Sequence, residues 1–298
     1  MAKKLVHFDE VRNNNIKSFI LIVLFMLMVA GFGYIVGLLW GNIYLGIIIT
    51  LIIGGIYALI AYFQGKNMVM SIAGARPVTK KEYPYLYHTV EGLSLAAGIP
   101  TPKCYVIPSK SLNAFATGRT PDDSAVAVTE GLLERLNREE LEGVIAHEIA
   151  HIKNRDIRTM MLAVVLVGIV VLLSDVFLRS IIFGGGGNRD GRATVIMFIV
   201  GLVLAILAPI FAEMIKLAIS RKNEYAADAR GAVLTRNPRG LANALKKISG
   251  DPNPMENANS AMAHLYIGSP YRKKRKIFQK LFSTHPPTEE RIRRLEAM

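Results

Sequence analysis

The sequence predicts a mainly α-helical membrane protein with two transmembrane helical hairpins and an α+β domain that contains a small sheet. Three observations predict this fold class. Hydrophobic residues make up 51% of the 298 residues, and they concentrate in two pairs of long apolar segments. The remaining chain is expected to form one mostly helical domain, and "NREELEGVIAHEIAHIKNRD" within it has an amphipathic helical pattern. Three short runs there, "CYVI", "NAFATG" and "AVAVTE", have the composition of strands.

The first apolar pair predicts a transmembrane hairpin over residues 18–63. No charged residue occurs between Ser18 and Trp40, and a second uncharged run follows the Gly41-Asn42 turn and ends at Phe63. Each run exceeds the roughly 20 residues that a helix needs to cross the hydrocarbon core. The first run is too long for a cleaved signal peptide, and it leads directly into a second span. Residues 1–17 then form a short terminus on one side of the membrane.

The second apolar pair predicts another hairpin over residues 159–218. Its two members are joined by "GGGGNRDGR", which has the composition of a flexible linker. Asp175 and Arg179 lie in the first member, so a buried or re-entrant hairpin is the alternative to a spanning one.

Two hairpins place residues 64–158 and 219–298 on the same side of the membrane as the amino terminus. Lys and Arg near the spans are more numerous on this side, which the positive-inside rule assigns to the cytoplasm. The net charge of +13 therefore fits membrane flanks, and no nucleic-acid partner is expected. The basic run "YRKKRK" suits anionic lipid headgroups of the bilayer, or a plain solvated face.

The stretch "NREELEGVIAHEIAHIKNRD" predicts an amphipathic helix. Asn137 can cap its start, and Glu140 can reach back to complete a capping box. Four residues at helical spacing form an aliphatic stripe along one face, namely Leu141, Ile145, Ile149 and Ile152.

His147 and His151 lie one turn apart on this helix, roughly 115–155° from the middle of the aliphatic stripe. Two imidazoles at this spacing can bind one Zn²⁺, and Glu148 beside them can hold a water molecule and take its proton. The alternative, two histidines on an ordinary helix, is disfavoured because they lie away from the stripe.

A catalytic zinc needs a third protein ligand, and "NEYAAD" offers one. Glu224 and Asp228 lie one turn apart with small alanines between them. Glu224 is the predicted ligand, and Asp228 is placed to accept the Nδ1–H of a zinc-binding histidine. The alternative is a solvated acidic pair. An even number of membrane crossings returns Glu224 to the side of the histidines, so we expect a site close to the membrane surface.

Four motifs occur in one order around the apolar pairs, "LNAFATG", "HEIAH", "NEYAAD" and "STHPPTEERI". In this the chain resembles the HtpX-type bacterial membrane zinc metalloproteases, gluzincins related to the CAAX prenyl proteases. The resemblance covers nearly the whole chain and implies a gluzincin-type metalloprotease domain. It also implies one Zn²⁺ per chain held by His147, His151 and Glu224, with Glu148 as the general base.

The resemblance implies further roles outside the zinc ligands. Asn113 would lie in an edge strand that binds the substrate backbone by β-addition. His285 would stabilise the oxyanion, with Arg291 as a supporting charge. An ordinary surface-loop histidine is the alternative at position 285.

The implied function is a zinc endopeptidase of the bacterial plasma (inner) membrane, a multi-pass protein whose active site faces the cytoplasm. Its expected substrates are misfolded or damaged membrane proteins and loosely folded polypeptides, within quality control under stress. Whether copies of the chain associate is left open.

This function has three alternatives. An intramembrane protease is disfavoured because the charged "KNRD" follows the histidines directly. A CAAX-type prenyl-protein protease is not well excluded. A non-catalytic scaffold would close a structural zinc with Cys104 or His264 as a fourth ligand. Otherwise Cys104, the single cysteine, is expected to be a small buried hydrophobe.

Overall fold

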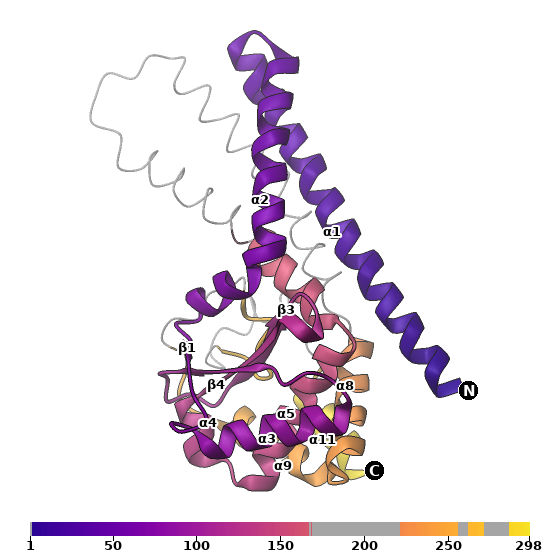
Figure 1. Cartoon of the computed structure of the whole chain (residues 1–298), viewed down its shortest axis with the longest axis vertical. Coiled ribbons are helices and arrows are strands. Elements are labelled where there is room, and N and C mark those ends of the chain that lie inside the picture. Colours follow the sequence, from indigo (N-terminus) through magenta and orange to yellow (C-terminus); the bar gives the residue numbers. More distant parts are fainter. Residues whose placement is uncertain (1, 167, 169–220, 256–261, 271–285) are drawn as a thin grey trace.

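Two long helices stand side by side and project from a domain of shorter elements (Figure 1). The computed structural model describes residues 2–166, 168, 221–255, 262–270 and 286–298. Most of the second predicted hairpin, His285 and the run "YRKKRK" therefore lie outside the described residues. Within 159–218, the described residues 159–166 are helical and buried.

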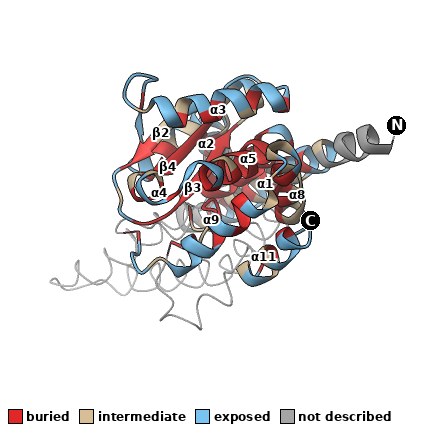
Figure 2. Ribbon diagram, turned by 90° about the horizontal axis from the view of Figure 1, so that it is seen from below, coloured by how far each residue is buried: buried red, intermediate tan, exposed pale blue. Residues whose placement is uncertain are grey.

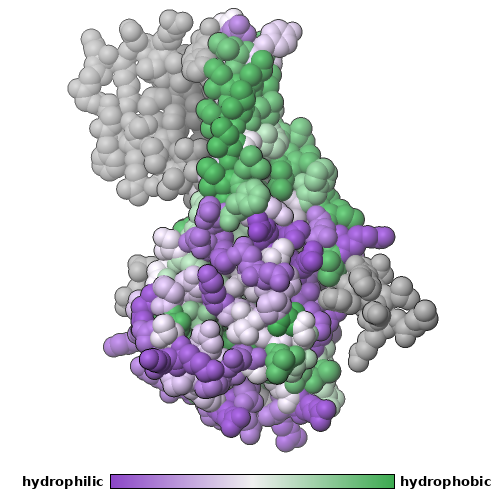
Figure 3. All heavy atoms as spheres, in the orientation of Figure 1, coloured by the Kyte–Doolittle hydropathy of each residue, from purple (hydrophilic) through white to green (hydrophobic). Residues whose placement is uncertain are grey.

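The projecting helices are α1 (Ala2–Trp40) and α2 (Ile43–Ile72), which confirm the first predicted hairpin. Both are long and apolar enough to cross a membrane, and only 28% and 17% of their most apolar windows are buried. Such low burial is unlike that of a core helix of a soluble protein, and Figure 3 shows the apolar surface of the two helices. Both helices exceed the predicted limits of 18–63. The first residues continue α1, and the end of α2 enters the domain.

The two helices touch backbone to backbone near the turn that joins them. Asn42 caps α2 by accepting a hydrogen bond from the Leu45 N–H at 3.0 Å. A Cβ added at Gly46 would lie 2.5 Å from the Gly33 carbonyl oxygen and 2.5 Å from the Gly37 Cα. Small residues at such a contact are typical of helix pairs in membranes, where close packing drives association.

A four-stranded mixed sheet forms one layer of the domain, in the order β1-β2-β4-β3. The three predicted strands are confirmed as β2 (Lys103–Ile107), β3 (Ala114–Gly118) and β4 (Ser124–Thr129). β2 runs parallel to β4, and β3 pairs with β4 antiparallel at the edge of the sheet. A short β1 (Arg76–Pro77) was not predicted, since two exposed residues carry no strand pattern.

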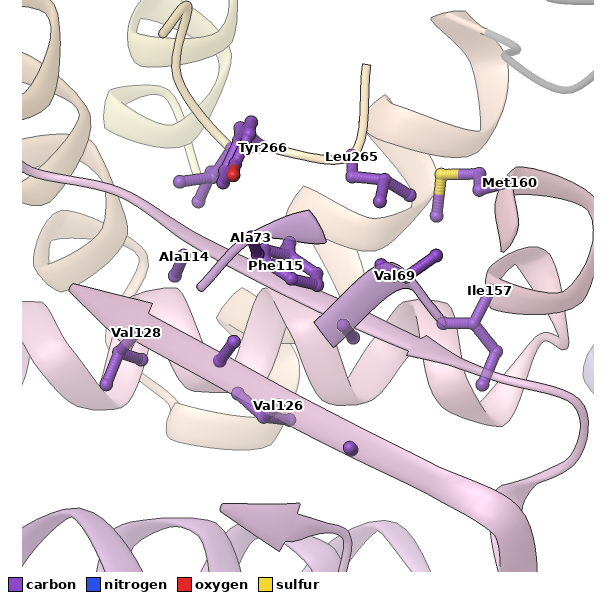
Figure 4. Packing of buried hydrophobic residues seen from close by; sticks show 14 of the residues in the cluster. Val69, Ala73, Ala114, Phe115, Val126, Val128, Ile157, Met160, Leu265 and Tyr266 are labelled. Carbon is purple, nitrogen blue, oxygen red and sulfur yellow. The ribbon is translucent and has the colours of Figure 1, made fainter. Parts of the chain in front are cut away.

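The last turns of α2 are packed into the core of the domain. Val69 of α2 and Ala73, which directly follows the helix, lie beside Phe115 of β3 and Tyr266 (Figure 4). The rings of Phe115 and Tyr266 meet edge to face at 5.3 Å between centroids, a favourable aromatic arrangement. The apolar hairpin is therefore fixed to the domain, because its end is part of the same hydrophobic core.

Helix α5 (Arg138–Lys153) lies at the centre of the domain and is buried over most of its length (Figure 2). The remaining described helices are α3 (Pro84–Ala97), the single turn η1 (Pro121–Asp123), α4 (Glu130–Arg135), α8 (Arg221–Thr235), α9 (Pro238–Gly250) and α11 (Thr288–Glu296). Helices α3, α8 and α9 and strand β3 all contact α5. Because α5 is central and contacts these elements, side chains from several parts of the chain can meet beside it.

Candidate metal centre

The start of α5 has the capping box that the sequence predicts. The Asn137 side chain accepts from the Glu140 N–H at 2.9 Å, and the Glu140 carboxylate accepts from the Asn137 N–H at 2.9 Å. This reciprocal pair satisfies two backbone donors at the helix terminus. The histidine face of α5 is buried as well as the aliphatic stripe, because His147, Glu148 and His151 are all at most 3% exposed.

Three side chains converge on one point beside α5. The Nε2 atoms of His147 and His151 are 3.1 Å apart, and Nε2 of His151 lies 3.3 Å from Oε1 of Glu224. Nε2 of His147 lies 3.9 Å from Oε2 of the same carboxylate. Two nitrogens bound tetrahedrally to one ion at about 2.0–2.1 Å would be separated by about 3.3 Å. The group therefore has the composition and spacing to hold a divalent metal ion.

Helix α8 brings Glu224 to the histidines because it packs closely on α5. Gly231 makes the approach possible, since a Cβ there would lie 3.1 Å from the backbone nitrogen of His147. Ala227 is fully buried in the same contact face. Glu224 and Asp228 are each 3% exposed, which rules out the alternative of a solvated acidic pair.

A carboxylate contacts the Nδ1 atom of each imidazole, on the side of the ring away from the point where the Nε2 atoms converge. Oδ1 of Asp228 lies 2.9 Å from Nδ1 of His147, as the sequence predicts. Oδ2 of Asp156 lies 2.9 Å from Nδ1 of His151. An acceptor at Nδ1 holds a hydrogen there, which leaves Nε2 of each neutral imidazole as the atom available to a metal ion at the common point.

Asp156 is a functional residue that the sequence analysis missed. It follows α5 after a turn in which Arg155 has a positive φ of 59°, a left-handed conformation rare for a residue with a side chain. This turn directs Asp156 back towards His151. The available signal was an aspartate in "KNRD" shortly after the second histidine, but its direction depends on a backbone angle that the sequence does not reveal.

Arg291 is almost completely buried behind the metal-binding group. Its Nε and Nη2 donate to the two Asp228 oxygens at 2.8 and 2.7 Å, and Nη1 lies 3.4 Å from Oε2 of Glu224. Burial would raise the pKa of Asp228, but Arg291 and His147 outweigh it and hold that pKa at about 2. Arg291 therefore keeps charged the carboxylate that orients His147.

The electrostatic setting of Glu148 differs from that of Asp228. Burial raises the pKa of Glu148, although His147 and His151 act in the opposite direction. Burial lowers the pKa of His151, but Asp156 and Glu224 outweigh it, so the net shift is well upward. The raised proton affinity of Glu148 is what a proton-accepting group needs near neutral pH.

Asn113 lies directly before the edge strand β3, and its side chain is already engaged. The amide donates to the Gly268 carbonyl at 3.0 Å and accepts from the Gly268 N–H at 3.2 Å. The Ala114 carbonyl accepts from the Ile267 N–H at 3.0 Å, so this segment covers the start of the edge. A direct contact between the Asn113 side chain and a substrate would break these bonds.

Neither candidate for a closing fourth ligand belongs to the metal-binding group among the described residues. Cys104 is buried in β2, where its Sγ lies 3.9 Å from the Pro102 carbonyl oxygen. Nε2 of His264 lies 3.4 Å from the Met160 carbonyl oxygen.

Comparison with known proteins identifies the family. A model of peptidase family M48 matches residues 80–298. The chain belongs to peptidase family M48. Two relatives named Protease HtpX homolog match over nearly their whole length. That of Tropheryma whipplei (strain Twist) is 44% identical over 98% of each chain. That of Streptococcus pneumoniae (strain Hungary19A-6) is 46% identical over 98% of this chain and 99% of its own.

Among solved structures, the crystal structure of S. mikatae Ste24p is similar at 20% identity with a TM-score of 0.49. The match covers 92% of this chain and 61% of that one. The full-length relatives confirm the predicted resemblance to HtpX-type proteases. Together with the two apolar helices, they make this M48 peptidase a membrane metalloprotease.

The buried Arg291–Asp228 pair predicts a large loss of stability when only one partner is removed. Arg291→Met should lower the free energy of unfolding of the metal-free peptidase by about 3–5 kcal/mol, because it leaves a buried carboxylate unpaired. Thermal unfolding in detergent micelles measures this loss. Arg293→Met on the same helix, with a side chain 76% exposed, should change it by less than about 0.5 kcal/mol. Equal melting temperatures for the two variants would contradict the structural role given to Arg291.

Proposed function

We propose that the chain is a zinc-dependent endopeptidase that cleaves cytoplasmic segments of misfolded or damaged membrane proteins. One observation carries the proposal: two Nε2 atoms and the Glu224 carboxylate converge, while buried carboxylates occupy both Nδ1 atoms. Zinc prefers nitrogen and oxygen ligands in this arrangement, and three protein ligands leave a fourth position for water or substrate.

In this proposal, bound zinc supplies Lewis acidity that polarises the scissile carbonyl and lowers the pKa of a water molecule to about 7. Glu148 accepts the proton of the attacking water and passes it to the departing amine. A hydrogen bond from the Ala116 backbone helps to hold the Glu148 carboxylate in place. Oxyanion stabilisation by His285 remains part of the proposal and rests on the family resemblance.

The edge strand β3 is the proposed docking site for an extended substrate. Among the described residues, β3 is paired along the sheet with β4 alone, and Ala116 of β3 also contacts Glu148 through its backbone. A peptide added beyond Ala114 would therefore lie next to the general base. Asn113 would assist by fixing Gly268 rather than by touching the substrate.

The main alternatives are a prenyl-protein protease and a scaffold with a structural zinc. The first would share the zinc chemistry but act on lipidated tails. The second is disfavoured because Cys104 and His264, the candidate closing ligands, both lie outside the metal-binding group.

Glu148→Gln should keep about one zinc per chain but reduce cleavage of casein by a factor of about 10²–10⁴, because the amide cannot accept the proton. Metal analysis and a proteolysis assay on the same preparation measure both quantities. Glu142→Gln, on the same helix but paired with Arg138 at the surface, should remain active. Full activity of Glu148→Gln would refute the assignment of the base.

The same casein assay separates the two protease functions. A native enzyme that cuts prenylated peptides but never casein would favour the prenyl-protein protease.

The proposed orientation predicts which cysteines a membrane-impermeant maleimide reaches. Tyr44, in the first turn of α2 beside the connection between the spans, is 81% exposed, and Tyr44→Cys should be labelled in intact spheroplasts. Lys81→Cys, exposed on the domain, should be labelled only after permeabilisation. The native Cys104 should give little background, because it is buried and burial raises its pKa to about 12. The reverse labelling pattern would place the domain outside the cytoplasm.

A further inference from the structure

A buried polar cluster connects the first apolar helix to the metal centre. Its members are Asn14 of α1, Asn154 at the end of α5, Asp156 and Asn223 of α8. Asn14, Asn154 and Asp156 are at most 4% exposed. These residues come from three parts of the chain, and the proposed function uses Asp156 but not the three asparagines.

Asp156 uses its two oxygens for different purposes. Oδ2 faces Nδ1 of His151 at 2.9 Å. Oδ1 accepts from the amide of Asn14 and, at 2.8 Å, from the amide of Asn223. A buried carboxylate is costly unless hydrogen bonds compensate for the water it has lost. The two amides provide that compensation, so they also determine where Asp156 points.

Asn14 contacts two other residues of the cluster besides Asp156. Its amide also donates to the Asn154 carbonyl at 3.1 Å, which fixes the end of the helix that carries both histidines. Its Oδ1 lies 3.4 Å from the amide nitrogen of Asn223, the residue that precedes Glu224 in the chain. One side chain of α1 therefore touches both segments that provide the metal-binding group.

We propose that Asn14 is a positioning residue for the metal centre, which it orients through Asp156 and His151. The first membrane helix is then part of the support of the metal site as well as an anchor. This inference rests on the proposed function, because it assumes that His151 binds the metal.

Asn14→Ala should weaken zinc binding about tenfold to a hundredfold, the usual effect of losing a residue that supports a metal ligand. Competition with a chromophoric chelator measures the affinity of the full-length protein in detergent. Asn14→Leu, closer to asparagine in size, should give the same loss while preserving helix packing. In cobalt-loaded protein, both variants should also change the visible absorption bands, which report ligand geometry.

Ser18→Ala is the matched control, one turn further along α1. The Ser18 hydroxyl lies 2.9 Å from that of Thr159 and donates to the Asn14 carbonyl, so its loss weakens the same helix contact without removing a donor to Asp156. Its zinc affinity should be native. If Asn14→Ala lowers the melting temperature as Ser18→Ala does but leaves zinc affinity unchanged, Asn14 is merely structural and the inference is wrong.

A double-mutant cycle tests the route through Asp156. If Asn14 acts on the metal through that carboxylate, Asn14→Ala should cause no further loss of affinity in an Asp156→Ala background. Additive losses would overturn the proposed route. Glu224→Ala tests the metal site independently of Asn14. Native zinc affinity in that variant would refute the assignment of Glu224 as a metal ligand. Weak binding by Glu224→Ala with native binding by both Asn14 variants would refute only the positioning role.

Discussion

The fixed orientation of two imidazoles by buried carboxylates is the interaction on which the rest of this structure depends. Asp228 and Asp156 occupy the Nδ1 atoms of His147 and His151, so that both Nε2 atoms face Glu224. Neither carboxylate could remain buried alone. Arg291 compensates Asp228, and the amides of Asn14 and Asn223 compensate Asp156. The site is therefore held by a shell of polar contacts from four separate parts of the chain, and α1 is one of them.

Patterns within one segment allowed the central features to be predicted from the sequence. The uncharged run from Ser18 to Trp40 identifies a span because the bilayer imposes its length. The capping box at Asn137 and the spacing of His147 and His151 are properties of a single helix, and the structure has both features. Glu224 could be paired with the histidines because a catalytic zinc needs a third ligand and the two predicted hairpins would return the chain to the same side.

Contacts between distant segments could not be read in the same way. Asp156 turns back to His151 because Arg155 adopts a left-handed conformation. Asn14 meets Asp156 because α1 begins well before the apolar run that starts at Ser18. The resemblance to known proteases indicated Arg291 as a supporting charge without revealing that its partner is Asp228. Asn113 was expected in an edge strand that binds the substrate backbone, and the sequence did not reveal that its side chain holds Gly268. Each of these depends on tertiary packing, which no local pattern specifies.

The most direct test of the central claim is a crystal structure of the zinc-loaded Glu148→Gln variant, with anomalous scattering measured at the zinc edge. One peak per chain is expected, at about 2.0–2.2 Å from Nε2 of His147, Nε2 of His151 and a Glu224 oxygen, with a water molecule as the fourth ligand. A peak elsewhere, or a fourth position filled by Cys104 or His264, would contradict it.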